Sequence, residues 1–182
     1  MNIFFLSFDV EKCAWLYCDQ HVGKILLEIV QMLYTAQHIL GNTQLVEKKA
    51  PLKVDKTQRG YKKVSNPKHA MVMWVRSHKN NYLFAADLGI ALALEFYKRF
   101  GKVHSCSRHV YWLKNNPPNN FFLVENEKSY YAETDVPEYL TRIPECMDSK
   151  YHDKSILVAY RRYYEEDKVR FARWKRRDEP YH

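Results

Sequence analysis

Apolar residues recur at helical spacing over most of this chain, and the pattern predicts an all-α fold. A first helical pattern starts at Asp9 or Glu11 and runs to Ile39, with a break allowed at Gly23. The dipeptide Gly41-Asn42 then supplies a stop signal, because glycine readily adopts the left-handed conformation that ends a helix.

Three further helices are predicted. The next one covers residues 68–100 and ends at Gly101, and its second half, 83–97, is apolar almost all round, which is typical of a buried central helix. A shorter helix covers 105–114, and the last one runs from about 153 to 177.

The remaining segments are predicted to be irregular. Residues 3–8 form a short, mostly buried extended segment, 43–68 a long flexible loop, and 115–150 an irregular connection with room for one hairpin. We therefore expect residues 1–182 to form one domain, an irregular helical bundle with a short extended N-terminal segment and long loops.

Composition supports a globular protein with an anionic partner. Of 182 residues, 46% are hydrophobic and 27% charged, whereas a disordered chain has far fewer apolar groups. The 29 Lys and Arg exceed the 21 Asp and Glu, and this excess favours a polyanion such as nucleic acid. Only 5 glycines argue against a glycine-rich nucleotide-binding loop.

Membrane, metal and secretion signals are weak. The apolar opening 1–9 is far shorter than the roughly 20 residues that span a bilayer, and it lacks a basic region and a cleavage site. The four cysteines form no CxxC pair, and Cys18 with His21 has no second ligand pair at zinc-like spacing. We expect an intracellular protein, cytoplasmic or nuclear, with no metal, no cofactor, no membrane partner and no obligate protein partner.

A narrow polar stripe interrupts the otherwise apolar stretch 19–38. Its members, here called the polar seam, follow one another at steps of three and four and share one helix face: His21, Lys24, Glu28, Gln31, Thr35 and His38. The seam is either the solvent side of the helix or the lining of a cleft. In a cleft, the partly desolvated carboxyl of Glu28 beside a lysine suits proton transfer, and its neighbours suit substrate binding.

Within this stretch, Asp19-Gln20-His21 is followed by Glu28, nine residues after the aspartate. This motif resembles the pyrimidine-dimer DNA glycosylases of the endonuclease V type, which are small, basic, mostly helical repair enzymes. That family and this chain both open with a short apolar segment at the N-terminus. The block His69–Trp74, the helix end Glu95–Gly101 and the aromatic and basic tail 160–177 are similar to later parts of that family.

The resemblance implies a covalent mechanism. In that family the α-amino group of the first residue attacks deoxyribose C1′, the base leaves, and the resulting imine permits strand cleavage by elimination. An α-amine has an ordinary pKa of about 7.7–8.0, against about 10.4 for lysine, so part of it is neutral near pH 7. The family's glutamate, matched by Glu28, positions the sugar and transfers protons. Such enzymes kink the duplex and displace a nucleotide from the stack.

Two features of the family take a different form in this chain. In the family, arginines near the catalytic glutamate bind phosphates. In this chain Leu27 stands directly before Glu28, and Gln31 stands three residues after it. Lys24 and His21 are the candidates to replace those arginines.

The chain terminus also differs. The family's mature terminus is a small residue exposed by removal of Met, whereas Asn2 follows Met1 here. Removal of Met before Asn is expected to be poor, so the reacting amine is that of Met1, that of Asn2, or neither.

Basic residues gather in two other segments. Residues 47–68 carry eight Lys or Arg against Glu47 and Asp55, and they are either phosphate contacts or a solvated loop. In the tail 161–177, arginines alternate with aromatic residues, which suits stacking on bases or equally a helix with one core face. The candidate DNA-binding residues of these segments are Lys48, Lys49, Arg59, Lys62, Lys63, Arg173, Lys175 and Arg176.

The charge pattern predicts a protein that binds nucleic acid, with double-stranded DNA as the expected partner. The resemblance implies a DNA repair glycosylase with AP-lyase activity on damaged pyrimidines. Two alternatives stay open. One is a nucleic-acid-binding module without catalysis, and the other is an enzyme that acts on a nucleotide or modified base in the same cleft.

Overall fold

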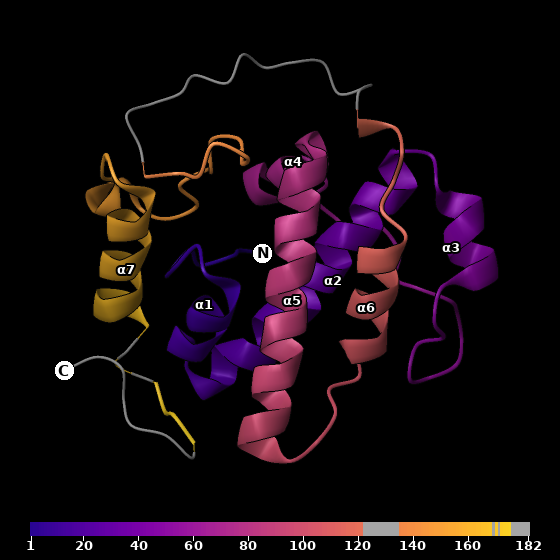
Figure 1. The fold of residues 1–182 in the computed structure, drawn as a ribbon, viewed down its shortest axis with the longest axis horizontal. Coiled ribbons are helices and arrows are strands. Elements are labelled where there is room, and N and C mark those ends of the chain that lie inside the picture. The colour runs from indigo at the N-terminus through magenta and orange to yellow at the C-terminus, as the bar shows by residue number, and fades with distance from the viewer. Residues whose placement is uncertain (122–134, 169, 171, 176–182) are drawn as a thin grey trace.

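The computed structural model describes residues 1–121, 135–168, 170 and 172–175, and this part of the chain contains helices but no β-strand (Figure 1). The helices, in chain order, are α1 (Val10–Leu16), α2 (Asp19–Ile39), α3 (Thr43–Lys49), α4 (Ala70–Ser77), α5 (Lys79–Phe100), α6 (Ser107–Asn115), the 3₁₀ turn η2 (Ser149–Tyr151) and α7 (Ile156–Asp167). The predicted all-α fold is confirmed. None of these helices has both the length and the apolar character that a membrane crossing requires.

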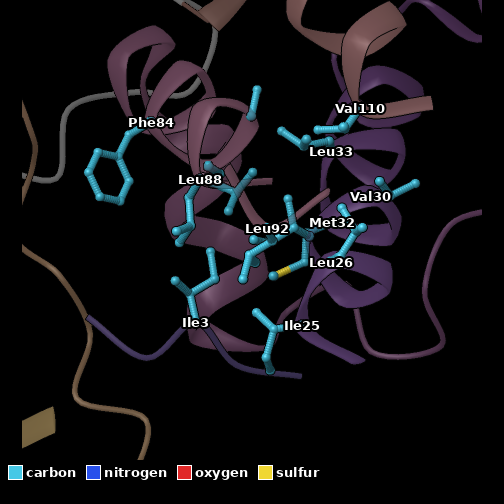
Figure 2. Packing of buried hydrophobic residues seen from close by; sticks show 14 of the residues in the cluster. Ile3, Ile25, Leu26, Val30, Met32, Leu33, Phe84, Leu88, Leu92 and Val110 are labelled. Carbon is cyan, nitrogen blue, oxygen red and sulfur yellow. The ribbon is translucent and has the colours of Figure 1, made fainter. Parts of the chain in front are cut away.

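Helices α2 and α5 pack against each other at the centre of the fold, and the other helices surround this pair (Figure 1). Leu33 of α2, Leu88 of α5 and Val110 of α6 are fully buried in the core that they share (Figure 2). A Cβ atom at Gly89 would lie 2.7 Å from Val110 Cγ2 and 3.2 Å from Ile29 Cγ2. The glycine therefore lets α2 and α6 approach α5 closely.

The N-terminal segment is buried, as predicted, although it pairs with no strand. Ile3, Phe5 and Leu6 are all 0% exposed. The Tyr17 hydroxyl accepts a hydrogen bond from Phe4 N (2.9 Å) and donates one to Phe4 O (2.7 Å). A side chain thus satisfies backbone groups that a sheet would otherwise pair, and the chain terminus is held inside the bundle.

The first predicted helix is two helices, and its break is not at Gly23. Tyr17 and Cys18 adopt extended conformations between α1 and α2, whereas Gly23 lies within α2. The prediction was wrong because glycine is tolerated inside a buried helix, and a tertiary contact with α5 decides where α1 ends.

That contact is the buried side chain of Arg99, which is 1% exposed. Its guanidinium donates to Glu95 Oε1 (2.7 Å), Asp19 Oδ1 (3.2 Å) and the Tyr17 carbonyl (2.7 Å). It also donates to the carbonyls of Trp15 and Ala14. One cation therefore satisfies the last carbonyls of α1 and joins them to the first residue of α2.

Two other predictions of helix limits were wrong, and one was close. Residues 43–49 form α3 rather than the start of a loop, because Val46 is buried and packs near Gly60. The predicted helix 68–100 is divided at His78, which is extended and whose ring accepts a hydrogen bond from Asn80 N. The helix 105–114 is found as Ser107–Asn115, and Gly101 ends α5 in the left-handed conformation, as predicted.

The last helix is also shorter than predicted and ends at Asp167. Its extension was wrong because the backbone at 173–175 returns to α2: Asp19 N donates to Arg173 O, and Lys175 N donates to the Asp19 carboxylate. The described part of 115–150 contains η2 and no hairpin, and residues 122–134 lie outside the described residues.

Replacing Arg99 with Met should destabilise the fold by about 3–5 kcal/mol, because the change leaves buried carboxylates and carbonyls without their donor. Lys102→Met removes a positive charge from an exposed position just after α5 and should cost less than about 0.5 kcal/mol. Urea unfolding of both variants measures the difference. Equal stability of the two variants would show that the guanidinium does not organise the α1–α2 corner.

Candidate active site at the amino terminus

The polar seam meets the start of the chain at Glu28. The backbone N–H of Asn2 donates to Glu28 Oε2 at 2.8 Å, across 26 residues of sequence. Both residues are half-buried, so the contact lies at the edge of the core rather than in open water. The structure thus brings together two of the residues that the sequence analysis proposed as catalytic, and the amine of Met1 is one residue from the contact.

The side chain of Asn2 fixes this arrangement. Its Nδ2 donates to the Cys146 carbonyl at 2.9 Å, and its Oδ1 accepts from Ile3 N at 2.9 Å. The Tyr160 hydroxyl lies 3.3 Å from the same Oδ1. These contacts anchor residue 2 to α7 and to the connection before it, so the backbone nitrogen has little freedom relative to Glu28.

His69 lies close enough to this site for the charges of Glu28 and the chain terminus to act on its ring. Its Nδ1 accepts from Met71 N at 3.2 Å and caps α4, so a neutral ring carries its proton on Nε2. Burial lowers the pKa of His69 below the usual 6.5, the terminal ammonium lowers it further, and Glu28 raises it. Both charges therefore act on the ring. No chemistry was assigned to His69 from the sequence, where its signals were a position near the start of a helix and its place in the block His69–Trp74.

Lys24 and Gln31 lie one turn before and one turn after Glu28 on the same helix. Lys24 is exposed and Gln31 is half-buried. Toward the end of α2, Thr35 Oγ1 accepts a hydrogen bond from Val64 N at 3.1 Å, so the segment after α3 covers this part of the seam. The seam is therefore solvent-exposed at Lys24 and covered at Thr35, with Glu28 between them.

His21 belongs to the packing of the first turn of α2. Its Nδ1 lies 2.8 Å from the Tyr164 hydroxyl, and its ring packs 5.1 Å from that of Phe4. Burial lowers the pKa of His21 to about 4, and the charge of Lys24 contributes to the shift. Substrate binding by His21 stays a prediction, and the structure shows that one ring nitrogen is already in use.

The motif Asp19-Gln20-His21 thus has a structural role of its own. Asp19 binds Arg99, and His21 contacts Tyr164. Nine residues of helix place Asp19 half a turn round α2 from Glu28. The aspartate therefore orients the helix, whereas Glu28 faces the chain terminus.

The candidate DNA-binding residues fall into separate groups. Lys48 and Lys49 are exposed at the end of α3. The backbone beside Arg173 and Lys175 is bonded to Asp19, on the side of α2 away from Glu28. Arg176 lies outside the described residues.

The remaining group surrounds a hollow of about 540 Å³ near the end of α2, and it consists of Arg59, Lys62 and Lys63. A second hollow, of about 490 Å³, lies beside Phe8 and Tyr139 and contains none of the predicted site residues. Within the described residues, no cluster of three or more His, Cys, Asp or Glu side chains is placed to hold a metal ion.

Comparison with models of protein families, with curated proteins and with solved structures finds no match to this chain.

Protonation of His21 should make the fold less stable in acid. The unfolded histidine takes up a proton near pH 6.5, whereas the folded one does so near pH 4, so the free energy of unfolding falls as the pH drops through this window. His21→Gln keeps an acceptor for the Tyr164 hydroxyl. Between pH 7 and pH 5, the free energy of unfolding of this variant should fall by about 1 kcal/mol less than that of the wild type.

Chemical unfolding at the two pH values measures this, with the exposed His152→Gln as the control. An unchanged pH dependence in His21→Gln would show that His21 titrates normally in the folded protein.

Proposed function

We propose that this protein is a DNA glycosylase with AP-lyase activity on damaged pyrimidines, in which the terminal α-amine is the nucleophile and Glu28 transfers protons. The observation that carries the proposal is the 2.8 Å contact between the backbone nitrogen of residue 2 and Glu28 Oε2. In this structure the nitrogen is the peptide N–H of Asn2, and removal of Met1 would convert it into the terminal α-amine. An α-amine beside Glu28 is the pair that the motif resemblance requires.

Each catalytic step has a group in this pair. Glu28 accepts a proton from the ammonium, and the neutral nitrogen forms a bond to C1′ of deoxyribose. The bond from C1′ to the base breaks, and the base leaves with its electron pair and a proton. The nitrogen then loses a proton, the bond from C1′ to the ring oxygen O4′ breaks, and O4′ takes up a proton, so that the opened sugar is held as an imine. Removal of a proton from C2′ then expels the 3′ phosphate.

The surroundings suit this chemistry. Asn2 is held by Cys146 and Tyr160, which reduces the entropy lost when the amine is positioned for attack. His69 is kept neutral in its capping role and presents an N–H group, so it can donate to a sugar or phosphate oxygen. The net charge of +8 favours DNA as the partner.

Borohydride reduction tests the covalent step. Incubation with a duplex that contains an abasic site or a pyrimidine dimer, followed by borohydride, should give a covalent adduct on the peptide that begins at Met1 or Asn2. A variant with extra residues before Met1 is the matched control and should give none, because its amine is moved out of reach of Glu28.

An adduct on an internal lysine such as Lys24 would contradict the assigned nucleophile. A complete lack of adduct, with salt-sensitive DNA binding retained, would favour the alternative of a nucleic-acid-binding module without catalysis.

Glu28→Gln should lower the single-turnover rate by about 100-fold or more, the scale of general acid–base catalysis. The amide keeps an oxygen to accept the Asn2 hydrogen bond but cannot take up the proton. Its melting temperature and its affinity for DNA should stay close to those of the wild type. Glu11→Gln, on an exposed position of α1, controls for the loss of one negative charge. Full activity in Glu28→Gln would remove Glu28 from the mechanism.

A further inference from the structure

Residues 61–69 run antiparallel to α2 along the polar seam. His38 Nε2 donates to Tyr61 O at 3.0 Å, and Val64 N donates to Thr35 Oγ1 at 3.1 Å. At the end of the segment, the charge of Glu28 acts on His69. The segment that the sequence analysis took for a flexible loop therefore forms one side of a path from the end of α2 back to the candidate active site.

Three cations converge at the far end of this path. Arg59, Lys62 and Lys63 line the hollow of about 540 Å³, together with His38 of α2 and with Glu47 as its one carboxylate. Within the described residues, none of the three cations is in a salt bridge. Clustered like charges repel one another, so this arrangement is stabilised when an anion enters.

The groups of the hollow are held in place by the backbone. Arg59 Nη1 donates to Ala50 O at 2.9 Å, which directs the guanidinium and leaves its other N–H groups for a ligand. The backbone carbonyl of Tyr61 accepts a hydrogen bond from His38, and the Tyr61 ring centroid lies 5.8 Å from that of Tyr34. Arg59 and Tyr61 are therefore held at the hollow, and the exposed side chains of Lys62 and Lys63 line it beside them.

Helix geometry relates this hollow to Glu28. Ten residues separate Glu28 from His38, which corresponds to about 15 Å along α2. Duplex DNA rises about 3.4 Å per base pair, so the same distance spans four to five base pairs.

We propose that the hollow formed by Arg59, Lys62 and Lys63 binds the phosphodiester backbone of the damaged duplex four to five base pairs from the nucleotide that reacts at Glu28. The distance of four to five base pairs from the reacting nucleotide rests on the proposed function, whereas the binding of phosphate by the hollow can be measured without catalysis. Contacts of this kind position a duplex without reading its sequence.

The first test is the salt dependence of binding to a duplex of about 20 base pairs with a stable abasic analogue. Lys62→Gln combined with Lys63→Gln should reduce the slope of log affinity against log salt by about 2 and weaken binding about tenfold at low salt. The control, Lys79→Gln with Lys102→Gln, removes two exposed cations at the ends of α5 and should leave both values unchanged. Equal effects of the two double variants would overturn the site.

The second test locates the phosphates. Single neutral methylphosphonates are placed at successive positions of the damaged strand and its complement, and the affinity of each duplex is measured. The wild type should lose affinity where the substitution lies four to five base pairs from the lesion, and the double lysine variant should be insensitive there. An equal loss of affinity at all positions would overturn the proposal. Displacement of the duplex by a mononucleotide at the same phosphate concentration would also overturn it.

Borohydride trapping of the wild type on a duplex of the same sequence, with a natural abasic site in place of the analogue, separates the two hypotheses. If the protein is trapped but no methylphosphonate position lowers the affinity selectively, only the proposed phosphate binding by the hollow is contradicted. If the position four to five base pairs from the lesion matters but no protein is trapped, phosphate binding by the hollow is supported and the catalytic proposal is contradicted.

Discussion

The buried guanidinium of Arg99 is the interaction on which the rest of this structure depends. A buried charge is costly unless every donor is used, and here carboxylates and backbone carbonyls from three helices share it. The same side chain ends α1, orients the first residue of α2 and attaches both to α5. With this corner fixed, the direction of α2 is fixed, and so is the side of the bundle on which Glu28 lies.

Helix α2 serves the fold and the candidate site with different faces. Its apolar residues, such as Leu33, pack against α5, and its polar seam runs between the chain terminus and the basic hollow. Because a helix is rigid, a group at Glu28 and a group at His38 keep a constant separation. In the proposed function, this constant separation would hold a polyanion bound at one end of the seam in register with the carboxylate at the other.

The contact between Asn2 and Glu28 depends on residues that are remote in sequence. Cys146 and Tyr160 hold the side chain of Asn2, and Tyr17 holds the backbone of the next residues. The N-terminal segment is therefore as well anchored as a core strand, although it belongs to no sheet. In the proposed mechanism this anchoring would position the terminal nucleophile, since a free chain end would rarely meet its substrate in the right orientation.

Local patterns in the sequence determined the helical class, the central position of α5, the stop at Gly101 and the single polar face that carries Glu28. These features follow from periodicity and from the conformational freedom of glycine, which act within a few residues. Only the tertiary structure decided the break at Tyr17, the helix α3, the course of residues 61–69 over the seam and the place of His69 beside the terminus. Each of these depends on contacts between segments far apart in the chain, such as Arg99 with α1 and Thr35 with Val64, and such contacts leave no periodic trace in the sequence.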